Sequence, residues 1–259
     1  MSQYDKIIIP SNTNKHYSNI VIYKNDLGDR KMQFDYSDDV SNNVFQSSYN
    51  INDIDRFNLT YLNFIILLFL YTELTESFLF IGLGGGHLPL FIKSKLPSAQ
   101  MEVVELDDQV VEGAKKMGFP DDLITVYIQD GIEFIKKCTK KYDVIVIDLD
   151  GDESYVGFDF KSIFEILENS GILAVNVYAE TGKTNVQNQI KLAFPLIKHF
   201  KNGNSNVFLC KKNLDLFENM LDNITLDSLN KEFNLLNKFS YKSKLLNVTT
   251  SAKKSIILN

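Results

Sequence analysis

The chain has 259 residues, 44% of them hydrophobic and 23% charged, which is ordinary for a soluble globular protein of one large domain or two small ones. Its net charge of −6 argues against a general nucleic-acid-binding surface, which needs a basic field. The longest apolar run, FIILLFLY, is too short to span a bilayer, so we expect no membrane partner. The two cysteines lack metal-ligand spacing and the N-terminus lacks the apolar core of a signal peptide, so we expect a cytoplasmic protein without a metal site.

Residues 1–57 are interpreted as a small antiparallel β region. Polar segments rich in Asn, Asp and Ser alternate there with the short apolar runs KIIIP, NIVIYKN and KMQFDYS. NDLGDR, between the last two runs, supplies a turn with Gly28. A helix is expected over about 57–72, after the Asx-rich NINDIDR. We expect the β region to cover the mouth of the site that the next domain forms.

From residue 78 to residue 212, strands and helices alternate. Continuous apolar strands predict a parallel sheet that is buried on both faces, and an Asn/Gly turn in LIKHFKNGNSNVFLCKK predicts a terminal antiparallel hairpin. Residues 58–212 are therefore predicted to form a Rossmann-like α/β domain with a seven-stranded sheet. Residues 213–259 have helical periodicity and are expected to form a helical tail. The expected parallel strands are FLFIG, QMEVVEL, ITVYIQD, YDVIVIDL and GILAVNVY, and the helices that follow them are GHLPLFIKSKL, DDQVVEGAKKM, GIEFIKKC, FKSIFEILE and NVQNQIKLAF.

Four glycines directly follow the first of these strands, in FLFIGLGGGHLPL. In this fold the turn after the first strand faces the ligand crevice. A dinucleotide site would have G-x-G-x-x-G, but His87 occupies the third glycine position. Gly82, Gly84 and Gly86 form G-x-G-x-G instead, which is typical of class I S-adenosylmethionine enzymes. A tight strand-to-helix turn is the alternative interpretation.

Two acidic residues end the next two strands. Glu105 ends the second, where a carboxylate can accept hydrogen bonds from both ribose hydroxyls. Asp130 ends the third, where it can accept the adenine amino proton, and Gly131 beside it is assigned to the same site. A helix cap is the alternative, although Asp107 or Asp108 suits that role better than Glu105. The loop and the two acids together predict an S-adenosylmethionine site, because NAD would explain only the loop and the first acid.

Asp148, Asp150 and Asp152 follow the fourth strand in IDLDGDE, beside the expected position of the sulfonium. Carboxylates there could bind an amine substrate and accept its proton. A solvated acidic loop and a metal site are the alternatives. Two residues after the fifth strand, Asn176 and Tyr178, are further candidates for the catalytic role. An equally good interpretation of Asn176 is a structural residue whose hydrogen bonds are all satisfied.

The stretches FIGLGGGHLPLFIKSKLPSAQMEVVELDDQVVEGAKKMGF, QDGIEFI and YDVIVIDLD resemble spermidine synthase-like class I S-adenosylmethionine-dependent methyltransferases, within the aminopropyltransferase superfamily. Within residues 44–212 the sequence resembles the C-terminal domain of the eukaryotic elongation-factor methyltransferase. The resemblance implies an adenosyl-binding role for Gly82, Gly84, Glu105 and Asp130. It places Asp148 where aminopropyltransferases carry a catalytic aspartate, matches Gln46 to a cofactor-side glutamine, and implies a homodimer.

Three departures from aminopropyltransferases favour methyl transfer over polyamine synthesis. Those enzymes carry GGGDG and D-S-S-D-P where this chain has GLGGGHLP and DLDGDES, and their Tyr-His-Glu is absent from RFNLTYLNF. We therefore predict a methyltransferase that N-methylates a protein or small-molecule amine, with Asp148 and Asp150 as catalytic carboxylates. The alternatives are a polyamine aminopropyltransferase that uses decarboxylated S-adenosylmethionine, and a non-catalytic adenosyl-binding assembly module.

Overall fold

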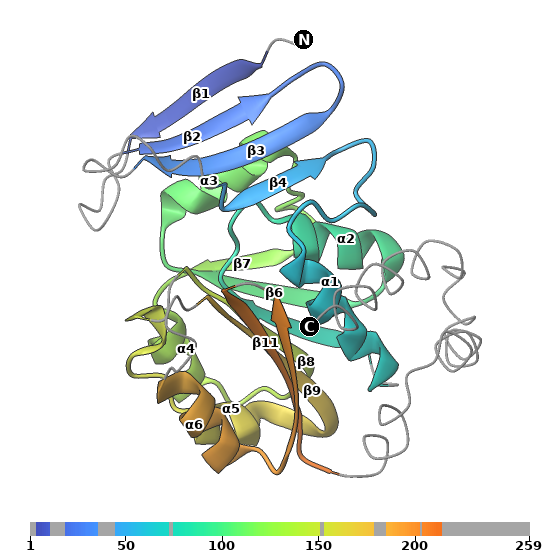
Figure 1. Ribbon diagram of the computed structural model, residues 1–259, viewed down its shortest axis with the longest axis vertical. Helices are drawn as coiled ribbons and strands as arrows, with labels where there is room; N and C mark the ends of the chain where they lie inside the picture. Colours follow the sequence, from blue (N-terminus) through green and yellow to red (C-terminus); the bar gives the residue numbers. More distant parts are fainter. Residues whose placement is uncertain are drawn as a thin grey trace.

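Two β-sheets make up the framework of the protein (Figure 1). The computed structural model describes residues 4–10, 19–35, 45–72, 75–150, 153–178, 185–202 and 204–213. The helical tail predicted for residues 213–259 lies outside these ranges except for its first residue, and Asp152 lies outside them as well. Among the described residues, no helix is both long and apolar enough to cross a membrane.

The smaller sheet has four antiparallel strands in chain order, which confirms the predicted N-terminal β region. A turn at Gly28 joins the second and third strands, as expected. Ile20, Ile22 and Met32 are fully buried and pack on helix α3 (Asp108–Met117), where Gly113 leaves room for the Met32 side chain. The sheet is thus docked on the second domain. Its strands are β1 (Asp5–Pro10), β2 (Asn19–Lys24), β3 (Asp29–Asp35) and β4 (Ser47–Asn50).

The helix expected over 57–72 is shorter than predicted and changes type. It begins as α1 (Tyr61–Ile65) and continues as the 3₁₀ helix η1 (Ile66–Leu70). The Asx-rich stretch before it forms turns instead of a cap, because the Asp53 N–H donates to the Asn50 carbonyl and the Arg56 N–H donates to the Asp53 carbonyl. The helix therefore starts only after these turns are complete.

The larger sheet has seven strands in the order β10-β11-β9-β8-β5-β6-β7, with β5 to β9 parallel, as predicted. The antiparallel hairpin of β10 (Leu196–Asn202) and β11 (Ser205–Lys211) completes it. The parallel strands are β5 (Ser77–Ile81), β6 (Gln100–Glu105), β7 (Thr125–Ile128), β8 (Tyr142–Asp148) and β9 (Leu167–Tyr178). The remaining helices are α2 (His87–Lys95), α4 (Gly131–Lys137), the 3₁₀ turn η2 (Glu153–Tyr155), α5 (Phe160–Ile166) and α6 (Asn185–Ala193).

Helices cover both faces of this sheet, as Figure 1 shows. Phe78 and Phe80 of β5 pack in the core that contains α1, α2 and α3. Leu79 and Ile81 point the other way, into the core that contains α4, α5 and α6. The continuous apolar strands are explained by this double burial. Strand β9 begins earlier than the predicted GILAVNVY, because Leu167 pairs with Tyr142 before a register irregularity.

Candidate active site

The glycine loop between β5 and α2 owes its glycines to its backbone conformation. Gly82, Gly84 and Gly86 have φ values of 93°, 52° and 76°, in the left-handed region that favours glycine. A Cβ on Gly82 would lie 2.2 Å from the backbone oxygen of Asp148. The tight-turn interpretation is therefore sound, and the loop also abuts the end of β8.

Strand β4 of the smaller sheet contacts the same loop. The Gly85 N–H donates to the Ser47 Oγ at 2.7 Å, and the Tyr49 hydroxyl donates to the backbone oxygens of Gly85 and Met117 at 3.3 and 3.0 Å. The contact of Ser47 could not be predicted from the sequence, because a serine in a polar stretch carries no distinguishing pattern. Gln46, the predicted cofactor-side glutamine, lies next to it, and its Oε1 accepts the Phe34 N–H at 2.8 Å.

Glu105 links the end of β6 to the glycine loop. Its Oε2 accepts the Leu83 N–H at 2.9 Å, and its Oε1 accepts the Asp107 N–H at 3.0 Å. Burial raises the pKa of Glu105, while these backbone hydrogen bonds oppose the rise. Asp107, not Glu105, caps helix α3 by accepting the Gln109 N–H at 2.8 Å. Glu105 is thus held in place by main-chain donors.

Asp130 caps helix α4, so the alternative interpretation of this residue is correct as a structural role. Its Oδ1 accepts the backbone N–H groups of Ile132 and Glu133 at 2.7 and 3.4 Å. The side chain is exposed at the end of β7. Gly131 follows in the first turn, where a Cβ would lie 2.6 Å from the Ile81 side chain. The adenine-binding role of this pair remains a prediction.

Asp148 receives two side-chain hydrogen bonds at the end of β8. The Tyr61 hydroxyl of α1 donates to its Oδ2 at 2.8 Å, and the Asn176 side-chain amide donates to its Oδ1 at 2.8 Å. Burial raises the pKa of Asp148, the two hydrogen bonds lower it, and the nearby Asp150 raises it further. Nothing in the sequence singled out Tyr61, which is 87 residues away.

Asn176 has a further feature beside Asp148. It is only 4% exposed, and its Oδ1 is buried with no hydrogen-bond partner within the described part of the chain. Asn176 is therefore only half satisfied as a structural residue. An unpaired buried acceptor costs free energy, and an N–H donor from a ligand would remove that cost.

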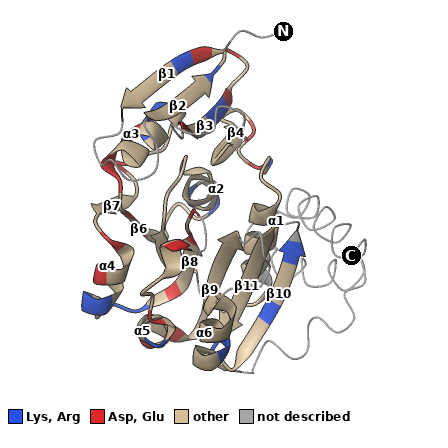
Figure 2. Ribbon diagram, turned by 60° about the vertical axis from the view of Figure 1, so that its left-hand side comes forward, with Lys and Arg blue, Asp and Glu red and all other residues tan. Residues whose placement is uncertain are grey.

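The remaining predicted residues, Asp150 and Tyr178, lie at the surface of the candidate active site. Asp150 is exposed, and Tyr178 is 46% exposed and accepts a hydrogen bond from the Asn204 side chain at 3.3 Å. Glu105 ends β6 and Asp148 ends β8, and Figure 2 colours the acidic residues red. Among the described residues, no three His, Cys, Asp or Glu side chains are grouped to hold a metal ion.

His87, which occupies the third position of the dinucleotide pattern, is buried at the start of α2. Its Nε2 pairs with the Ile54 carbonyl at 2.8 Å, its ring stacks on Tyr49, and its Nδ1 has no partner in the regions that the structure describes. Burial lowers the pKa of His87 to about 4. The residue is a neutral packing element beneath the loop.

Known proteins resemble the chain in both sequence and structure. The eEF1A lysine and N-terminal methyltransferase of Mus musculus is 32% identical over 147 residues, which make up 49% of this chain and 21% of that protein. The match thus spans about a fifth of the length of that relative. Human methyltransferase-like protein 13 in complex with SAH has a TM-score of 0.52 at 22% identity, over 70% of this chain and 89% of that one.

A probable spermidine synthase from Corynebacterium glutamicum ATCC 13032 has a TM-score of 0.67 at 12% identity, over 87% of this chain and 86% of that one. At these identities the two solved structures show a shared fold. A family model described as "Spermine/spermidine synthase domain" matches residues 79–222, from β5 to beyond β11, the last of the described strands. Because this match covers more than half of the chain, the protein belongs to the spermine/spermidine synthase domain family.

Proposed function

We propose that the protein is an S-adenosylmethionine-dependent methyltransferase that acts on an amine. One observation carries the proposal: the glycine loop touches the backbone of Asp148, so close that a Cβ on Gly82 would lie 2.2 Å from its oxygen. A ligand on this loop would therefore have its reactive end beside a carboxylate. The names of the relatives, which are methyltransferases, support the same activity.

The residues around the loop fit an adenosyl ligand. Each carboxylate oxygen of Glu105 accepts one backbone N–H, and a carboxylate offers about four acceptor positions in all. We infer that the ribose hydroxyls donate to the remaining lone pairs of this carboxylate. Asp130 uses only Oδ1 for its two capping hydrogen bonds, which leaves Oδ2 for the adenine amino group.

Bound S-adenosylmethionine would supply an electrophilic methyl group to a neutral nucleophile. An α-amine with a pKa near 7.8 costs only about 1 kcal/mol to deprotonate at pH 7, whereas a lysine costs roughly 4–5 kcal/mol. Asp148 would orient the amine and accept its proton, and its raised pKa makes it a better base than an exposed aspartate. The unpaired Asn176 Oδ1 would accept a second N–H, which favours an amine over a hydroxyl acceptor.

Calorimetry with three ligands tests the proposal. We expect the protein to bind S-adenosylmethionine and S-adenosylhomocysteine, and to bind decarboxylated S-adenosylmethionine less tightly. Transfer of a radiolabelled methyl group to amine acceptors then checks the reaction. Absence of binding to all three ligands would contradict the proposal and favour a non-catalytic assembly module.

A polyamine aminopropyltransferase is the second candidate. The probable spermidine synthase covers 87% of this chain, against 70% for methyltransferase-like protein 13, and this wider structural match favours it. Preference for the decarboxylated ligand, with aminopropyl transfer to a diamine, would establish this alternative.

A cytoplasmic homodimer is also part of the proposal. Both cysteines, Cys138 and Cys210, are free thiols, which supports a reducing compartment. Sedimentation equilibrium of the full chain measures its oligomeric state, and a monomer at all concentrations would contradict the dimer.

A further inference from the structure

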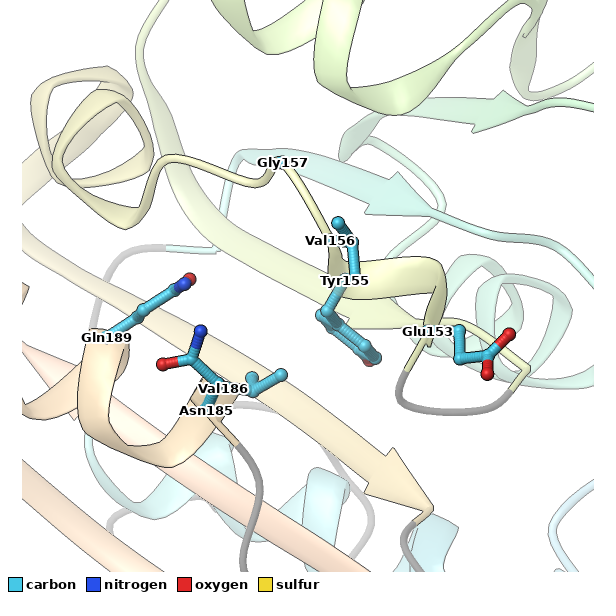
Figure 3. Close-up of a pocket in the computed structure, with 7 residues that line it drawn as sticks. All are labelled: Glu153, Tyr155, Val156, Gly157, Asn185, Val186 and Gln189. Atoms are coloured by element: carbon cyan, nitrogen blue, oxygen red, sulfur yellow. The ribbon is translucent and has the colours of Figure 1, made fainter.

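A cavity of about 340 Å³ lies between η2 and helix α6 (Figure 3). This volume is at the lower end of the range for small-ligand sites, so it suits one side chain or a small molecule. The described residues that line it are Glu153, Tyr155, Val156, Gly157, Asn185, Val186 and Gln189. In Figure 3 the Gln189 side chain extends from α6 toward the segment from Tyr155 to Gly157.

The polar lining of the cavity combines the side-chain amides of Asn185 and Gln189 with the carboxylate of Glu153. The Gln189 Oε1 is buried and has no hydrogen-bond partner among the described residues. Glu153 supplies a carboxylate, and no described lining residue is basic. Val156, which is 77% exposed, adds an apolar surface at the rim. Such a lining suits a ligand with N–H donors, a positive charge and an aliphatic stem.

Tyr155 connects the cavity to the candidate active site. Its ring lines the cavity and is 1% exposed, and its hydroxyl donates to the Asn176 backbone oxygen. The side-chain amide of Asn176 in turn donates to Asp148 at 2.8 Å. Tyr155 and Asn176 therefore connect the cavity to the Asp148 carboxylate, next to the ends of β8 and β9.

We propose that this cavity is an acceptor subsite, which binds a lysine, arginine or glutamine side chain next to the methylated amine of a polypeptide. The inference rests on the proposed function and deepens it by naming the acceptor class. The ligand N–H groups donate to Gln189 Oε1, and Glu153 adds charge recognition. Acidic side chains are excluded because they would face the Glu153 carboxylate.

Short peptides with a free α-amine test the subsite. The series Ala-X-Ala-Ala-Tyr, with X as Lys, Gln, Leu or Glu, is titrated into the full chain by calorimetry with S-adenosylhomocysteine present. Methyl transfer from S-adenosylmethionine to the same peptides is measured in parallel. We expect the Lys peptide to bind about 10-fold more tightly than the Glu peptide, with the Gln peptide between them.

Two variants and two controls assign the preference to the cavity. Gln189→Leu should weaken binding of the Lys and Gln peptides about 3- to 10-fold and leave the Leu peptide unchanged. Glu153→Gln should remove the advantage of Lys over Gln. Gln187→Leu on the same helix and Glu165→Gln on α5, neither of which lines the cavity, should change nothing.

The outcomes separate this inference from the proposed function. Selective binding that the two variants abolish, together with transfer, supports both. Selective binding without transfer supports the subsite and contradicts methyl transfer. Transfer without selectivity, or selectivity that survives both variants, overturns the subsite and leaves the proposed function standing. Absence of both binding and transfer overturns both.

Discussion

Glu105 and Asp148 end the strands on either side of β5, but they are held in different ways. Glu105 accepts backbone N–H groups from residues 2 and 22 positions away. Asp148 accepts hydrogen bonds from side chains 28 and 87 positions away. We call the glycine loop, Glu105 and Asp130 the cofactor half, and Asp148, Tyr61 and Asn176 the acceptor half. Backbone N–H donors remain when the side chains around them change, so the cofactor half suits a ligand that is always the same. The acceptor half depends on side-chain donors and therefore on particular residues.

The largest expected effect is on turnover in the acceptor half. Asp148→Asn keeps the size of the side chain and removes its charge, so turnover should fall about 10²- to 10⁴-fold, the range for a general base. Calorimetry should find unchanged S-adenosylmethionine affinity. Asp150→Asn, at an exposed position, is the control and should lose less. Unchanged turnover of Asp148→Asn would contradict the proposed role of Asp148 as the general base.

The second effect concerns the packing beneath the cofactor half. Because burial lowers the pKa of His87 from 6.5 to about 4, the unfolded chain binds a proton in this window and the folded chain does not. Stability should therefore fall as the pH drops from 6.5 to 4, by roughly 3 kcal/mol at most. Urea unfolding at pH 7 and at pH 5 measures the difference in the free energy of unfolding between the two pH values. In His87→Gln, which retains a donor for the Ile54 carbonyl, the difference between the two pH values should shrink by roughly 2 kcal/mol.

A third effect isolates the cofactor half. Glu105→Ala should weaken S-adenosylmethionine binding by about 1.5–3 kcal/mol, the range for hydrogen bonds to a charged group. Calorimetry measures the affinity, and circular dichroism checks that the variant is folded. Glu102→Ala, on the same strand but away from the glycine loop, is the control. Wild-type affinity in folded Glu105→Ala would contradict the ribose assignment.

The smallest effect should come from Tyr61→Phe, which removes one hydrogen bond to Asp148. We expect kcat/KM to fall about 3- to 10-fold. Since that hydrogen bond lowers the pKa of Asp148, its loss should move the rising limb of the pH–rate profile to higher pH. Tyr127→Phe removes a similar contact to Glu102 outside the site and should leave the profile in place. If the pH–rate profile of Tyr61→Phe does not move, Tyr61 has no role in the proton transfer.

The same difference explains what the sequence could predict. The alternating elements from β5 to α6 and the glycine loop follow from local patterns, because buried strands and left-handed turns restrict the residues that can form them. The roles of Tyr61 and Ser47 could not be predicted, since each depends on a contact between segments far apart in the chain. The sequence could not decide between adenine binding and helix capping for Asp130, because a carboxylate at the end of a strand can also cap the helix that follows.

The position of β11 has a consequence for the order in which the protein is assembled. This last described strand lies inside the larger sheet, and β10 joins the sheet only through it. Helix α1, which carries Tyr61, rests on that hairpin, since the Phe64 and Phe200 rings stack at 5.7 Å. Contacts of such long sequence separation form late in folding. On the ribosome, the glycine loop and Glu105 can meet once β6 and α3 have emerged, whereas the helix that carries Tyr61 gains its contact with the hairpin only after residue 211 has emerged.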